Sequence, residues 1–215
     1  NRKIFVGEDT KNRRETMHKI ITIGREFGSG GRELGKRIAD TLQIAYYDQE
    51  IITELAKRTN QTEEYIRQLE ESNFIPLLPI TIGRTFSSQF YQAMEPNQAV
   101  FIEQSKMIKE MAEKSDCVIV GRCADYILRD KNPLRIFVYA DMDFKLARCR
   151  QKGEPTETKN DAELKRKMNA IDRQRAQYYQ CHTGRTWGEK SGYDLCINMT
   201  SLEIKNVAAA IAGLS

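Results

Sequence analysis

A glycine-rich segment near the N-terminal end of the chain has the residue types that bind phosphate. Gly28-Ser29-Gly30-Gly31 lies between an apolar run at 20–23 and a helix-like stretch that follows at once. The first backbone N–H groups of a helix have no internal partners, and the helix dipole adds partial positive charge there. Glycines let the backbone curl around a phosphate. We predict a phosphate-binding turn over 28–33, Arg32 and Glu33 included. The alternative is a strand-to-helix turn without a ligand.

The segment departs from the usual Walker A pattern, G-x-x-x-x-G-K-[ST]. When Gly30 is taken as the second glycine of that pattern, Gly31 occupies the place of the lysine and Arg32 follows it. The sequence therefore predicts phosphate binding without ordinary Walker chemistry.

Arginines in the C-terminal half of the chain offer a second means of binding phosphate. A guanidinium binds phosphate bidentately and stays charged, as phosphoryl transfer requires. Arg173 and Arg175 belong to one predicted helix, but at two positions apart they diverge by about 200° and need not serve the same phosphate. The alternative is a solvated basic helix face paired with neighbouring carboxylates. The set comprises Arg148, Arg150, Arg166, Arg173, Arg175 and Arg185.

Two polar residues directly follow predicted buried strands. Asp48 either orients a metal-bound water or a substrate hydroxyl, or caps the next helix, or does both. Arg122 stands where a Walker-B enzyme would show a carboxylate, which indicates anion recognition. The alternative for Arg122 is a salt bridge to Asp125 or Asp48. Because ligands of parallel sheets bind beyond the carboxyl ends of the strands, we expect both residues at the edge that holds the glycine turn.

Five apolar runs alternate with helical patterns, which predicts an α/β fold with a parallel sheet covered on both faces. The runs are 19–24, 44–47, 117–121, 134–140 and 193–198. The predicted helices are 31–42, 49–59, 62–71, 98–115, 123–129, 142–151, 161–181 and 202–212. Asn160 with Glu163, and Thr200 with Glu203, have the spacing of helix caps.

The composition predicts one globular α/β domain. The chain has 215 residues, of which 40% are hydrophobic and 30% charged, and a net charge of +4 that suits an anionic small ligand better than nucleic acid. No apolar run is long enough to span a membrane, and the N-terminal residues lack the apolar stretch of a signal peptide. Five scattered cysteines favour free thiols and a cytoplasmic location, with Cys117 and Cys196 as core residues of strands.

Three further segments carry open interpretations. Residues 1–16 are polar and are expected to be a flexible extension or residues left over from cloning, which leaves 17–215 as a single domain. Residues 73–97 are either a mobile flap over a ligand or, as we favour, a connecting segment packed by its own aromatics. Trp187 either stacks on a base or, as we favour, packs the preceding helix against the sheet.

The sequence resembles the cytidylate kinase-like proteins of bacteria, a branch of the P-loop nucleoside monophosphate kinases. The resemblance rests on I-T-I-G-R-E-F-G-S-G-G-R-E-L-G at 21–35 and V-I-V-G-R-C-A-D-Y-I-L at 118–128, with support from 46–48, 172–179, 183–188 and 193–198. It implies a three-layer α/β/α P-loop NTPase fold with a five-stranded parallel sheet of order 2-3-1-4-5. It also implies an acceptor-side region at 49–97 and a lid-like region at 150–190.

Similar enzymes transfer the γ-phosphoryl group of ATP to CMP or dCMP, with Mg²⁺. On this resemblance, residues 28–32 would hold the ATP phosphates. Asp48 and Arg122 would lie on the acceptor side, where we also place Arg148, and Arg173 and Arg175 would be lid arginines. Because Gly31 replaces the Walker lysine, Arg32 and Lys36 are the expected substitutes. The Mg²⁺ ligands stay unassigned.

Two rival functions follow from the same residues. The missing lysine is compatible with a nucleotide-binding sensor or interaction module that has little turnover. A P-loop kinase for a non-nucleotide metabolite is the other alternative. In each case we expect a small-molecule partner, with no nucleic acid and no membrane.

Overall fold

The centre of the molecule is a five-stranded parallel sheet. The computed structural model describes residues 18–71, 88–152 and 160–214. The strands are β1 (Ile20–Arg25), β2 (Ala45–Tyr47), β3 (Cys117–Val120), β4 (Leu134–Tyr139) and β5 (Leu195–Asn198). Their order is β2-β3-β1-β4-β5, as the resemblance implied, and every pairing is parallel. In the central strands β-branched residues are buried on both faces of the sheet.

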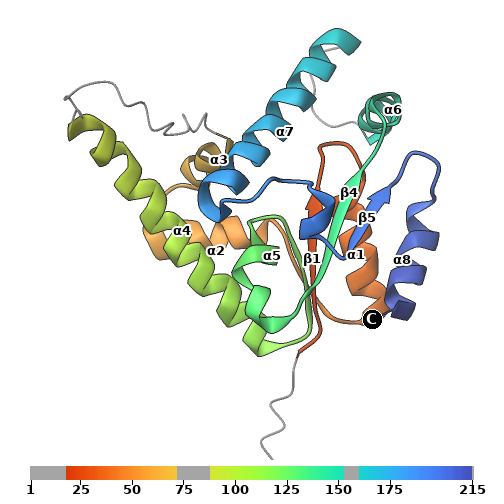
Figure 1. Cartoon of the computed structure of the whole chain (residues 1–215), viewed down its shortest axis with the longest axis horizontal. Coiled ribbons are helices and arrows are strands. Elements are labelled where there is room, and N and C mark those ends of the chain that lie inside the picture. Colours follow the sequence, from red (N-terminus) through yellow and green to blue (C-terminus); the bar gives the residue numbers. More distant parts are fainter. Residues whose placement is uncertain (1–17, 72–87, 153–159, 215) are drawn as a thin grey trace, which may run out of the picture.

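Helices cover both faces and complete the three layers (Figure 1). Helices α1 (Gly31–Leu42) and α8 (Ile204–Leu214) lie on one face, where Leu34 and Ile38 pack against Val118 and Ile136. The opposite face packs against α2 (Glu50–Thr59), α3 (Glu63–Glu71), α4 (Ser88–Lys114) and α5 (Ala124–Ile127), and its core includes Ile119. The buried residues of these helices form one apolar core with each face of the sheet.

Two helices lie beyond the carboxyl ends of the strands. Helix α6 (Met142–Lys152) follows β4, and α7 (Asp161–Thr183) rises above the sheet (Figure 1). A small apolar cluster of Leu146, Cys149, Leu164 and Met168 joins them. Two short 3₁₀ turns, Arg129–Lys131 and Lys190–Gly192, complete the described elements. None of the described helices is both long enough and apolar enough to cross a membrane.

The structure confirms one predicted helix cap and corrects the other. The side chain of Asn160 accepts a hydrogen bond from the backbone N–H of Ala162 at 2.9 Å, at the start of α7. The Thr200 prediction is wrong, because α8 begins only at Ile204 and the Thr200 hydroxyl donates to Asn198 instead. Cys117 is buried as predicted, but Cys196 is exposed on the edge strand β5. Residues 1–16 and most of 73–97 lie outside the described residues.

Candidate phosphate-binding site

The glycine-rich segment joins β1 to α1 and presents the start of that helix. Gly30 is the N-cap residue with a φ of 90°, in the left-handed region that favours glycine. The first hydrogen bond of the helix runs from the N–H of Leu34 to the carbonyl of Gly30 at 2.9 Å. The amides from Gly30 to Glu33 therefore occupy the positions that lack intrahelical acceptors. They offer four backbone donors to an anion, together with the positive end of the helix dipole.

The loop before the helix is held in place by its own atoms and by α7. The Ser29 hydroxyl is buried and donates to the carbonyl of Glu26 at 2.8 Å. The N–H of Phe27 donates to Asp172 Oδ1 of α7 at 2.7 Å. Lys145 Nζ of α6 lies 2.9 Å from Glu26 Oε2. The side chain of Ser29 thus shapes the loop from within, and the loop does not need a ligand to set its conformation.

A cavity of about 740 Å³ opens in front of the loop. It brings together residues from β1, the loop, α1, the end of β2, α6 and α7, at the edge where the parallel strands end. The described lining contains most of the residues that the sequence predicted for the site. They are Gly28, Gly30, Gly31, Arg32, Glu33, Lys36, Asp48, Arg148 and Arg175.

Asp48 supplies a buried carboxylate at the end of β2. Its Oδ2 lies 2.6 Å from Arg32 Nε, and its Oδ1 lies 3.9 Å from Arg25 Nη2. The Oδ1 atom is buried and, among the described residues, has no hydrogen-bond partner. Asp48 does not cap α2, because the N-cap residue of that helix is Gln49 and the helix has no capping hydrogen bond from a side chain. The carboxylate therefore points to the site.

Glu33 holds three cations at the head of α1. Its carboxylate lies 2.5 Å from Arg148 Nη2 and 2.9 Å from Lys152 Nζ, and Arg37 is a third partner at 3.0 Å. Burial alone would raise the pKa of Glu33, but the hydrogen bonds from these cations outweigh it and lower the pKa to about 2. Glu33 thus fastens α6 to α1 and keeps Arg148 beside the glycine turn.

A smaller pocket of about 110 Å³ adjoins the main cavity and is rich in arginine. Its lining shares Arg25, Arg32 and Arg175 with the larger cavity. Arg122 is a further member, and burial together with the nearby Arg25 charge lowers the pKa of Arg122 to about 10. Its one carboxylate among the described residues, Asp125, accepts a hydrogen bond from Tyr179 Oη at 2.6 Å. The pocket is suited to an anion.

The backbone at Arg122 is strained. Gly121, Arg122 and Cys123 follow β3 with φ values of 76°, 62° and 54°. Non-glycine residues in this left-handed region cost about 1–3 kcal/mol each and cluster at functional sites. The side-chain amide of Gln104 donates to the carbonyl of Arg122 at 3.2 Å, which helps to hold this conformation.

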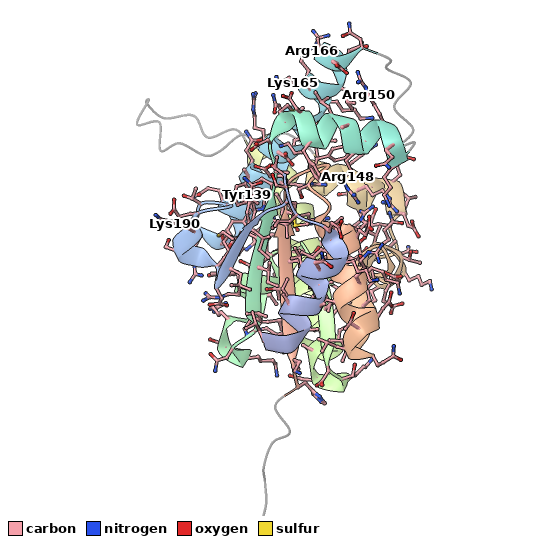
Figure 2. All side chains as sticks on the ribbon, turned by 90° about the vertical axis from the view of Figure 1, so that its right-hand side faces the viewer. Tyr139, Arg148, Arg150, Lys165, Arg166 and Lys190 are labelled. Atoms are coloured by element: carbon pink, nitrogen blue, oxygen red, sulfur yellow. The ribbon has the colours of Figure 1, made fainter. Side chains whose placement is uncertain are left out.

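Several of the predicted arginines lie elsewhere. Arg173 is exposed and does not line either cavity in the part of the chain that the structure describes. Arg150 pairs with Asp161, as expected for a solvated basic face. Figure 2 shows Arg166 at the outer end of α7, far from the sheet, whereas Arg148 lies on the side of α6 nearer to it. Trp187 packs edge-on against Phe137 with ring centroids 5.1 Å apart, which supports the anchor interpretation, although it also lines the smaller pocket.

The sequence reasoning missed Arg25 and Lys145. Arg25 is the last residue of β1 and lines both cavities. It could have been found by counting back along the Walker pattern from Gly30, because the first glycine of that pattern falls on position 25. Lys145 is a buried lysine inside an ordinary helical pattern, and nothing in its sequence context marks it.

The residues present suit Mg²⁺ as it is bound with nucleotides. Among the described residues no group of three or more His, Cys, Asp or Glu side chains is placed to hold a metal. Mg²⁺ in phosphotransferases needs only one or two carboxylates in addition to substrate phosphates and water. The unpartnered Oδ1 of Asp48 fits that need, whereas the carboxylate of Glu33 is already taken by cations.

The sheet order and the glycine-rich loop between β1 and α1 define a P-loop kinase type of fold. The chain belongs to the cytidylate kinase-like family, whose model matches residues 20–201. No curated protein matches the sequence.

Solved structures agree with this fold. An uncharacterized protein from Eubacterium ventriosum is 27% identical with a TM-score of 0.65, and the match covers 91% of this chain and 97% of that one. Shikimate kinase from Bacteroides thetaiotaomicron is 17% identical with a TM-score of 0.55, and the match again covers 91% of this chain and 97% of that one. At that identity the second likeness shows the fold alone.

Proposed function

We propose that this protein is an ATP-dependent phosphotransferase that acts on a nucleoside monophosphate, with CMP and dCMP as the first candidates. One observation carries the proposal. The free amides at the head of α1 open onto a cavity lined by Arg32, Arg148 and Arg175 and by the carboxylate of Asp48. Membership of the cytidylate kinase-like family supports the choice of acceptor.

The chain's own residues bind and orient the reactants. The amides from Gly30 to Glu33 hold the phosphates of the donor at the positive end of α1. Arg175 and Arg32 face the same cavity and stabilise the charge that shifts among the oxygens during transfer. Bound Mg-ATP supplies the phosphoryl group and part of the charge neutralisation, and Asp48 is the residue that would hold the metal or its water. No covalent intermediate is required.

The acceptor enters from the side of β2 and β3. Asp48 directly follows β2, and its Oδ1, which has no hydrogen-bond partner among the described residues, can accept a hydrogen bond from a hydroxyl group of the acceptor. Arg122 follows β3 and, with the other arginines of the smaller pocket, can hold the acceptor's own phosphate. We also place the reaction in the cytoplasm, which the five free cysteines support.

The test is an acceptor screen that measures ADP release from Mg-ATP. CMP, dCMP, UMP, AMP and GMP are compared with small hydroxylated metabolites and with a sample that lacks an acceptor. We expect CMP or dCMP to give the largest rate above the sample without acceptor, and the Arg32→Ala variant to abolish that difference. A larger rate with one of the hydroxylated metabolites would mean that the acceptor is a metabolite and not a nucleotide. If the protein binds nucleotide tightly but releases no ADP in any mixture, it is a nucleotide sensor and not a kinase.

A further inference from the structure

The loop lacks the lysine of the Walker pattern, and the two substitutes expected from the sequence are engaged elsewhere. Arg32 Nε lies 2.6 Å from Asp48 Oδ2. Lys36 Nζ lies 3.0 Å from Asp40 Oδ1, and more than half of the Lys36 side chain is exposed (58%). A Walker lysine must reach the β- and γ-phosphates from the loop. In the structure both side chains are thus paired with carboxylates.

Arg25 occupies the space that a side chain at position 31 would need. A Cβ atom built on Gly31 would lie 2.5 Å from the Cβ and 3.1 Å from the Cγ of Arg25. A contact of 2.5 Å with Cβ cannot be relieved by rotating the end of a side chain. Position 31 therefore has to be glycine, because the stem of Arg25 runs over it. The absence of a lysine at position 31 and the presence of an arginine at position 25 are thus linked.

The other end of Arg25 reaches the end of β3. A Cβ atom built on Gly121 would collide with Arg25 Nη1, so the guanidinium lies directly against the backbone of Gly121. The guanidinium lies between the cavity in front of the loop and the smaller arginine pocket, and it lines both. A phosphoryl group that passes from donor to acceptor must cross this boundary.

Among the residues that the structure describes, Arg25 is paired with one carboxylate, that of Asp48 at 3.9 Å. That carboxylate is already paired more closely with Arg32. Only 16% of the Arg25 side chain is exposed. Burial and the neighbouring Arg175 charge lower the pKa of Arg25 to about 9, which still leaves it charged near neutral pH. A phosphate would relieve this unfavourable concentration of positive charge.

We propose that Arg25 replaces the Walker lysine: its side chain crosses Gly31 and its guanidinium binds the terminal phosphates of the donor. This inference rests on the proposed function, and it names the residue that makes an incomplete Walker pattern workable. Because a guanidinium forms two parallel hydrogen bonds where an ammonium offers a point charge, the exchange keeps the cation and adds directionality.

The binding test uses calorimetry with a non-hydrolysable ATP analogue and Mg²⁺. Arg25→Met keeps the apolar stem of the side chain and removes its charge, and melting curves check that the variant is folded. We expect the affinity of Arg25→Met for the analogue to fall about tenfold or more, as loss of a hydrogen bond to a charged group implies, and Arg25→Lys to recover most of it. Arg150→Met is the matched control, because it removes an equal charge from the exposed face of α6 outside the cavity. Equal affinities for Arg25→Met and Arg150→Met would overturn the proposal.

A second test rebuilds the ordinary Walker arrangement. The double variant Arg25→Gly with Gly31→Lys restores glycine and lysine at their usual places and removes the collision between them. We expect it to bind the analogue more tightly than Arg25→Gly, whereas Gly31→Lys alone should bind more weakly than the natural protein. If the double variant is no better than Arg25→Gly while the melting temperatures agree, the proposed exchange between positions 25 and 31 is wrong.

The two proposals fail in different ways. If the natural protein transfers phosphate and the Arg25 variants bind and turn over normally, the inference about Arg25 is wrong and the proposed function stands. If no acceptor is phosphorylated but Arg25→Met weakens analogue binding, the proposed function is wrong and Arg25 keeps its role. If the natural protein does not bind the analogue at all, both are wrong.

Discussion

Asp48 Oδ2 and Arg32 Nε lie 2.6 Å apart, and this contact joins the end of β2 to the first turn of α1. The carboxylate is buried, whereas the Arg32 side chain is about half exposed (53%). The pair therefore has one fixed partner and one that can turn toward a ligand. In the proposed reaction Arg32 exchanges this carboxylate for a phosphate, which leaves Asp48 available to the acceptor or the metal.

We predict that Asp48→Asn lowers turnover much more than nucleotide affinity. The amide keeps the shape of the side chain but carries no charge with which to hold Mg²⁺, so kcat should fall by about 100-fold or more. Arg32 loses its anionic partner, so affinity for ATP should stay level or rise. Steady-state kinetics and calorimetry on the same samples measure the two effects. A fall in affinity that accounts for the whole loss of activity would show that Asp48 only positions Arg32.

The two neighbouring arginines of α7 provide a matched pair. Arg175 lines both cavities and donates to the carbonyl of Arg25 at 3.3 Å, whereas Arg173 is exposed. We predict that Arg175→Ala lowers kcat by about 100-fold, as loss of one charge-stabilising donor does in other enzymes, and that Arg173→Ala changes it little. Melting curves check that both variants are folded. Similar losses in the two variants would indicate that α7 moves and brings Arg173 to the substrate.

The N–H of Phe27 and Asp172 provide a test of loop organisation. Asp172 Oδ1 accepts this N–H at 2.7 Å, and Lys145 Nζ lies 3.7 Å from Asp172 Oδ2. We predict that Asp172→Ala weakens binding of the ATP analogue about fivefold, because a net hydrogen bond of about 1 kcal/mol no longer orders the loop. Asp172→Asn keeps an oxygen for the same N–H and should bind nearly as well as the natural protein. If both variants bind the analogue equally weakly, the effect comes from the lost negative charge of Asp172 and not from the hydrogen bond to Phe27.

The fold could be predicted well from the sequence, because the strands are short apolar runs and the helices have a clear periodicity of apolar residues between them. The predicted helix at 31–42 has the observed bounds. The strand-end rule also placed Asp48 and Arg122 correctly at the carboxyl edge of the sheet, since that rule depends only on the direction of the strands. Sequence patterns were therefore sufficient to place a residue where its position depends on the course of the backbone alone.

Local signals failed where packing decides. Arg175 lines the cavity and Arg173 does not, because only one side of α7 faces β1. The residues next to them in the sequence do not indicate which side that is. Thr200 has the spacing of a cap, but its N–H and hydroxyl are both bonded to Asn198, so the helix starts later. The role inferred for Arg25 depends on contacts with Gly31 and Gly121, which are distant from each other in sequence.

Folding stability should also depend on pH through His182. Its ring stacks on Phe101 with centroids 3.9 Å apart, and burial lowers the pKa of His182 from 6.5 to about 4. Between these two values the unfolded chain binds a proton that the folded chain does not, so the free energy of unfolding falls as the pH falls. We predict a loss of about 2 kcal/mol from this residue between pH 7.5 and pH 5, at about 1.4 kcal/mol per unit of pKa.

The variant His182→Phe keeps an aromatic ring beside Phe101 and removes the titration. Urea unfolding of both proteins over this pH range measures the difference, with the denaturant slope checked for constancy. We expect the natural protein to lose stability more steeply than His182→Phe as the pH falls. Parallel curves would mean that His182 becomes protonated while it stays stacked on Phe101 of α4, and the proposed coupling of its charge to unfolding would then be wrong.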